Sequence, residues 1–117
     1  MNLELIREKL LKLPGVTEGF PFDQETLVFK VGGKMFLLIA LESSPLRMNI
    51  KADPEKIIEL QEAYPDFAFP AYHMNKTHWV TIVASESPSQ DYFWKLILES
   101  RSLVLKSLPK SKQAMLG

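Results

Sequence analysis

The sequence predicts an α+β fold in which helices cover one face of an antiparallel sheet. Three observations support this prediction. Segments with helical spacing of apolar residues alternate with short apolar runs of strand length. The pair Gly32-Gly33 separates two such runs, as in a tight hairpin, and the run LRMNIK alternates apolar and polar residues. The expected order is helix, three strands, helix, two strands, helix.

Size and composition indicate a single globular domain. The chain has 117 residues, of which 46% are hydrophobic, and it contains no cysteine. Its 14 Lys and Arg residues balance 14 Asp and Glu residues, which removes the general electrostatic argument for a nucleic-acid partner. A local basic patch still forms if the acids lie on another face. We expect one domain over residues 1–108 and a flexible tail over 109–117.

The composition gives no sign of secretion or of a membrane. The first residues, MNLELIREKL, are charged and amphipathic, which is unlike a signal peptide. No window approaches eighteen consecutive apolar residues, the length typical of a membrane-spanning helix. We therefore expect a cytoplasmic protein without a membrane partner.

The first helix and the first hairpin have clear local signals. The helix is expected to start at Asn2, a favourable N-cap, and to end at Pro14. Its apolar residues form one stripe: Leu3, Ile6, Leu10 and Leu13. Strands are expected over 26–31 and 34–41, because Gly32-Gly33 suits the positive φ angles of a two-residue turn. The second of these strands is apolar on both faces, which favours an interior position.

A third strand is expected over 46–51, with one apolar face and one polar face. Leu46, Met48 and Ile50 point one way, while Arg47, Asn49 and Lys51 point the other way. Together with Lys30, these polar residues indicate a sheet face that the helices leave open.

The second half of the chain predicts helix, two strands and helix. Asp53 and Pro54 start a helix that ends at Pro65, and a third helix runs over 87–108 with Ser87 as its cap. The segment 67–75 is extended and broken by Pro70, so it is at best an edge strand, whereas 78–85 is a stronger strand. The inner stripe expected for the third helix is Phe93, Leu96, Ile97, Ser100 and Val104.

Catalytic and metal-binding patterns are weak. His73 and His78 lie five residues apart, but no carboxylate lies between Asp66 and Glu86 to complete a zinc site. The sequence has neither a nucleophile elbow nor a phosphate-binding loop. We expect no metal and no cofactor, and the enzyme hypothesis is limited to an unrecognised site near the two histidines.

Basic residues gather around the expected open face, and they are the candidate nucleic-acid-binding residues. Lys30 and Lys34 flank the hairpin, and two more basic side chains lie on the polar face of strand 46–51. The candidates are Lys30, Lys34, Arg47, Lys51, Lys76 and His78. The alternative interpretation of the same residues is an ordinary solvated sheet face.

The stretch PAYHMNKTHWVTI, supported by PGVTEGFPF and GGKMF, resembles the MmcQ/YjbR-like family of small, uncharacterised bacterial proteins. The resemblance covers residues 3 to 107, nearly the whole chain. It implies a CyaY-like fold, and it implies DNA as a partner on grounds of fold rather than of reaction. The signature residues are Pro70, Tyr72, His73, Met74, Asn75, Lys76, His78 and Trp79.

Three functional hypotheses follow. The first is a DNA-binding module that uses the basic residues on and beside the open sheet face. The alternative is a protein-interaction or chaperone-like module that binds another polypeptide or a second copy of the chain. The third is an enzyme with a site near His73 and His78. The signature is either scaffold, with Asn75 in a left-handed turn, or binding surface, and the sequence leaves the oligomeric state open.

Overall fold

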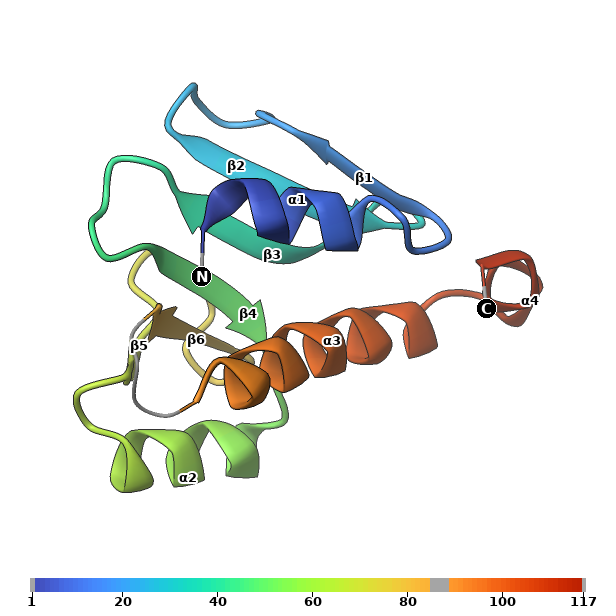
Figure 1. The fold of residues 1–117 in the computed structure, drawn as a ribbon. Helices are drawn as coiled ribbons and strands as arrows, with labels where there is room; N and C mark the ends of the chain where they lie inside the picture. The colour runs from blue at the N-terminus through green and yellow to red at the C-terminus, as the bar shows by residue number, and fades with distance from the viewer. Residues whose placement is uncertain (1, 85–88, 117) are drawn as a thin grey trace.

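A computed structural model describes residues 2–84 and 89–116, and it confirms the predicted α+β fold (Figure 1). Helices and strands follow the predicted alternation, with one further strand and one further helix. In chain order they are α1 (Leu3–Leu10), β1 (Val16–Gly19), β2 (Thr26–Val31), β3 (Lys34–Ala40), β4 (Arg47–Lys51), α2 (Pro54–Ala63), β5 (Ala68–Pro70), β6 (Trp79–Val83), α3 (Gln90–Lys106) and α4 (Lys110–Leu116).

The strands form one antiparallel sheet in the order β1-β2-β3-β4-β6-β5. The predicted hairpin joins β2 and β3, and the all-apolar strand β3 lies in the interior of the sheet. The chain then returns to place β6 beside β4, with Lys51 opposite Trp79. The short strand β5, which contains Pro70, lies at the edge as predicted, because proline has no N–H to donate to a further strand.

The main core lies between the sheet and the helices. Figure 1 shows α1 and α3 in front of the sheet and α2 below it. Side chains from alternate strand positions, including Phe29, Leu37 and Ile50, pack against α1 and α3 in one cluster of buried residues. The stripe predicted for α3 is confirmed, since all its members are buried: Phe93, Leu96, Ile97, Ser100 and Val104.

The helix starts agree with the local signals in part. Asn2 caps α1, because its side chain accepts a hydrogen bond from the Leu5 N–H at 2.8 Å. Asp53 occupies the N-cap position of α2 without a side-chain cap hydrogen bond. Helix α3 is capped by Ser89, and the expected cap Ser87 lies outside the described residues. Among the residues that the structure describes, no helix is long and apolar enough to cross a membrane.

Two elements go beyond the predicted order. Strand β1 pairs with β2 at the opposite edge from β5. Helix α4 lies within the segment 109–117, which we expected to be a flexible tail, and its Leu116 packs against the main core. Neither element has a strong local signal, and both depend on contacts with distant parts of the chain.

Candidate functional site

The segment between β5 and β6, residues 71–78, lies against the sheet face that points away from α1 and α3, here called the outer face. Ala71 and Trp79 are buried in a second, smaller apolar cluster with Val28 and Leu38 of β2 and β3. Met74 is partly buried against the same cluster. The outer face is therefore only partly open, because the 71–78 segment covers the apolar residues at its centre.

Backbone hydrogen bonds fix the shape of the 71–78 segment. The Asn75 carbonyl accepts from the N–H groups of His78 and Trp79, and the Asn75 side chain accepts from Thr77 N–H at 2.9 Å. The His78 carbonyl accepts from Ala52 N–H at 3.1 Å, which ties the segment to the end of β4. The left-handed residue is His73, with φ 68°, and not Asn75 as expected. Asn75 instead forms an Asx turn.

Three of the candidate basic residues lie on the outer face. Arg47 and Lys51 stand at the two ends of β4, and Lys30 lies on β2. Lys30 is opposite Met35 and Lys51 is opposite Trp79, so both lysines border the smaller apolar cluster.

The other candidates lie at the rim or apart from the outer face. Lys76 and His78 are exposed on the 71–78 segment, and the Lys76 Nζ lies 5.6 Å from the ring centroid of Tyr72. Lys34 is opposite Val31, which faces the helices, so its side chain is directed to the other side of the sheet from Lys30. The structure thus groups Lys30, Arg47, Lys51, Lys76 and His78 and separates Lys34.

The strands and the 71–78 segment give the outer face an excess of basic side chains, although the Asp23 carboxylate of the β1–β2 loop accepts a hydrogen bond from Thr26 Oγ1 at 3.4 Å at the start of β2. The strands contain a single acidic residue, Glu18, and the 71–78 segment contains none. Glu18 is directed to the helix side, where its carboxylate accepts a hydrogen bond from Arg7 Nε at 2.8 Å. This hydrogen bond from Arg7 lowers the pKa of the Glu18 carboxyl and keeps it ionised. The charged residues at the outward strand positions are therefore all basic, while the helices carry charges of both signs.

A concave site adjoins Arg47 on the outer face, and we call it the His73 pocket. It has a volume of about 310 Å³ and is lined by Thr26, Leu38, Ala40, Arg47, Asn49, Tyr72, His73 and Thr81. The Arg47 guanidinium carbon lies 5.5 Å from the ring centroid of Phe69, and Thr81 Oγ1 donates a hydrogen bond to Asn49 Oδ1 at 2.6 Å. Strands β2, β3, β4 and β6 supply its floor, and the 71–78 segment supplies its wall.

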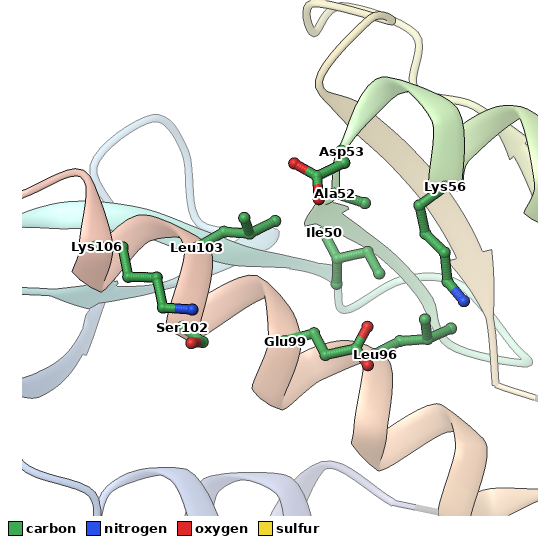
Figure 2. A pocket seen from close by; sticks show the side chains of 9 residues that line it. All are labelled: Ile50, Ala52, Asp53, Lys56, Leu96, Glu99, Ser102, Leu103 and Lys106. Carbon is green, nitrogen blue, oxygen red and sulfur yellow. The ribbon is translucent and has the colours of Figure 1, made fainter.

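A slightly larger hollow, of about 360 Å³, lies on the other side of the molecule between α2 and α3 (Figure 2). Its charged side chains have both signs, with Asp53 and Lys56 from the start of α2 and Glu99 and Lys106 from α3. It contains no aromatic side chain and no residue of the signature. Its mixed charge gives no preference for an anionic or a cationic ligand.

Sequence reasoning missed several residues of the His73 pocket. Alternation along β4 placed Asn49 beside Arg47, but Thr81 and Phe69 joined them only through the pairing of β4 with β6 and of β6 with β5. No local pattern reveals that pairing, because β4 and β6 are separated by α2 and β5.

Comparisons with known proteins agree with this fold. The family model described as YjbR matches residues 11–103. The uncharacterised protein YbdF of Escherichia coli O157:H7 is 40% identical over 114 residues, which cover 94% of this chain and 89% of YbdF.

Solved structures give the same result. The crystal structure of the Deinococcus radiodurans protein DR2400, described as a DUF419 domain, has a TM-score of 0.90 and 39% identity, covering 97% of this chain and 86% of that chain. A Pseudomonas syringae protein has a TM-score of 0.72 with 22% identity, covering 89% of this chain and 99% of that chain. At that identity the likeness shows the fold alone.

Proposed function

The chain belongs to the YjbR family, and from this membership and the charge of the outer face we propose that it is a DNA-binding module. The observation that carries the proposal is that neither the outward positions of the described strands nor the 71–78 segment contains an acidic residue. Lys30, Arg47 and Lys51 project there from strands that carry no acid on this face, and Lys76 adds a charge at the rim. Phosphate groups are the ligands that such a surface attracts.

The spacing of the cations suits an extended polyanion. Arg47 and Lys51 are four residues apart on β4, which separates them by about 13 Å. One strand of B-DNA presents a phosphate every 3.4 Å or so along the helix axis. A nucleic-acid strand that follows β4 therefore brings several phosphates within reach of both side chains.

A protein partner is the alternative, and the surface favours it less. Most of the large exposed apolar side chains come from separate segments of the described chain, while Phe20 and Phe22 share the β1–β2 loop: Leu11, Phe20, Phe22, Ile58, Tyr64, Tyr72, Leu98 and Met115. Apolar side chains scattered in this way are ordinary for a monomer surface and do not indicate an interface.

The test is fluorescence anisotropy of labelled single-stranded and duplex DNA at about 50 mM salt, where phosphate contacts are strong. The Lys30→Ala, Lys51→Ala double variant should lose roughly ten- to thirtyfold in affinity, because each lysine contributes about 1 kcal/mol to phosphate contact. The matched control is Lys12→Ala, Lys95→Ala, which removes the same charge from the exposed turn after α1 and from the exposed surface of α3. This control and Lys34→Ala should change the affinity by less than about twofold.

Two results would overturn the proposal. One is the absence of DNA binding at this salt concentration, which would direct attention to protein partners. The other is an equal loss in the two double variants, because net charge rather than the outer face would then explain the binding.

A further inference from the structure

We infer that the His73 pocket binds one nucleotide unit, with the phosphate at Arg47 and the base against Tyr72. The unit is either an unstacked nucleotide of single-stranded DNA or a free mononucleotide, since both present the same chemistry. The first case rests on the proposed DNA binding and deepens it, because it makes the protein prefer single strands. The second case stands without it.

The pocket favours an anion because its polar groups are mainly donors. Arg47 carries a permanent charge and lies over the Phe69 ring, so the guanidinium is held at the pocket. The Asn49 carbonyl already accepts from the Thr81 hydroxyl, which leaves the Asn49 amide group free to donate. No carboxylate is among the described residues that line the pocket. The Asp23 carboxylate, which accepts from the Thr26 hydroxyl at 3.4 Å, belongs to the β1–β2 loop and lies at the opposite end of the lining from Tyr72 in sequence.

An aromatic wall indicates a ligand with a planar group. Tyr72 is 68% exposed, although it belongs to a segment whose neighbour Ala71 is fully buried. The burial of Ala71 fixes the backbone beside Tyr72, the ring itself is open to solvent, and Lys76 Nζ lies 5.6 Å from the ring centroid. Nucleic-acid bases stack on such rings whatever their sequence. Leu38 and Ala40 complete an apolar floor that an inorganic anion would not need.

The volume of about 310 Å³ sets the size of the ligand. It lies at the lower end of the range for small-molecule clefts, which is suitable for one nucleotide unit and too small for two. A base that is paired and stacked within a duplex does not reach such a pocket unless it is flipped out. Single strands should therefore bind more tightly than duplexes of the same length.

The backbone of His73 supports a binding role for this wall. A φ of 68° places a non-glycine residue in the left-handed region, which is unfavourable by about 1 kcal/mol or more. Strain of this kind is concentrated at binding and catalytic sites. Here it occurs at His73, which lines the pocket beside Tyr72.

The first experiment follows the amide NMR signals of the full chain during titration with dAMP, deoxyadenosine and inorganic phosphate. The mononucleotide should shift the signals of residues 47–49, 72–73 and 81, and the nucleoside and phosphate should each shift them far less at equal concentration. Equal shifts by phosphate and dAMP would overturn base recognition and leave an anion site. Absence of shifts in all three titrations would overturn the pocket altogether.

The second experiment compares DNA affinities of the parent, Tyr72→Ala and Tyr72→Phe. Tyr72→Ala should weaken single-strand binding by about tenfold and duplex binding by less than about twofold, while Tyr72→Phe keeps the stacking surface and the affinity. Because the Tyr72 side chain is exposed, both variants should unfold at the same midpoint temperature as the parent.

The outcomes separate this inference from the proposed function. Equal affinity for single strands and duplexes, unchanged by Tyr72→Ala, would overturn the single-strand case and leave the DNA-binding surface intact; together with absent dAMP shifts it would overturn the nucleotide pocket. Binding of dAMP to the pocket without any binding of DNA would overturn the proposed function and support a site for free nucleotides. The Lys30→Ala, Lys51→Ala variant should still bind dAMP, because neither lysine lines the His73 pocket.

Discussion

Ser100 is the polar side chain that the described part of the molecule buries completely, and it lies where two strands diverge. Its hydroxyl donates to the Phe36 carbonyl at 2.6 Å and accepts from the Lys51 N–H at 2.8 Å. The ladder between β3 and β4 ends at Leu37 and Ile50, one residue before these two groups. The hydroxyl therefore replaces a missing ladder hydrogen bond and joins α3 to both strands.

Replacing Ser100 with alanine should lower the free energy of unfolding by about 1–3 kcal/mol, because it leaves two backbone groups without a partner. Urea unfolding followed by circular dichroism measures this change. Ser102→Ala is the matched control, since Ser102 lies on the same helix and is only half buried. A loss below about 0.5 kcal/mol in the Ser100 variant would contradict this account.

At the scale of elements, local signals predicted those parts of the fold that carry their own caps and turns. Asn2 caps α1, and Gly32-Gly33 joins β2 to β3, each through interactions within a few residues.

Helix α4 depends instead on a contact with a distant part of the chain. A side chain at Gly15 would lie 2.4 Å from Leu116, so α4 packs where the chain has a glycine, about a hundred residues away in sequence. Such distant contacts leave no local pattern, which is why α4 was expected to be a flexible tail.

The same limit applies to the candidate site. Alternation placed Arg47, Asn49 and Lys51 on one strand face, and the structure confirms their common side. The alternation of residues could not show that Ala71 and Trp79 bury part of that face. Tertiary packing determines on which side of the sheet a connecting segment lies, and a local pattern does not record it. Asn75 was expected in the left-handed region because asparagine tolerates that conformation. In the structure His73 adopts it instead, and Asn75 forms an Asx turn.

Strand β1 is attached to α1 by a side-chain pair. Arg7 donates to Glu18 through Nε at 2.8 Å, and the same guanidinium approaches Glu4 at 3.8 Å. The hydrogen bond to Arg7 lowers the pKa of Glu18, and the reciprocal hydrogen bond raises the pKa of Arg7. The pair thus favours the ionised form of both side chains. It also joins two elements that are adjacent in sequence, the helix α1 that covers the sheet and the edge strand β1.

Glu18→Gln should destabilise the fold at neutral pH and have a smaller effect in acid. A depressed pKa in the folded state means that the stabilisation is present above the unfolded pKa of glutamate and is lost as the pH falls through the folded pKa. Thermal unfolding of parent and variant between pH 7 and strongly acidic pH measures the convergence. Glu4→Gln, a far more exposed partner of the same arginine, is the control and should show little difference at any pH. A constant difference between parent and Glu18→Gln across the pH range would contradict the assignment.

At the scale of the whole molecule, the sheet divides the charge. The sequence gives equal numbers of basic and acidic residues, 14 of each, and this balance argued against a nucleic-acid partner. The fold places the strand acid Glu18 on the helix side, so the charged residues at the outward positions of the strands are all basic. Net charge is therefore a poor guide to this surface, because a partner responds to the local potential within a Debye length of about 8–10 Å.

This division of charge predicts the salt dependence of DNA binding. If the outer-face cations Lys30, Arg47, Lys51 and Lys76 each neutralise one phosphate, log K for duplex DNA should fall with log salt at a slope of about −3.6. Between 50 and 200 mM salt, the affinity should then fall by roughly a hundredfold. The Lys30→Ala, Lys51→Ala variant should show a slope of about −1.8, since it loses two contacts, while Lys12→Ala, Lys95→Ala keeps the parental slope. Anisotropy titrations at four salt concentrations measure these slopes. A parental slope near zero would mean that the outer face does not contact phosphates, and an equal reduction in both variants would mean that the contacts lie on no particular face.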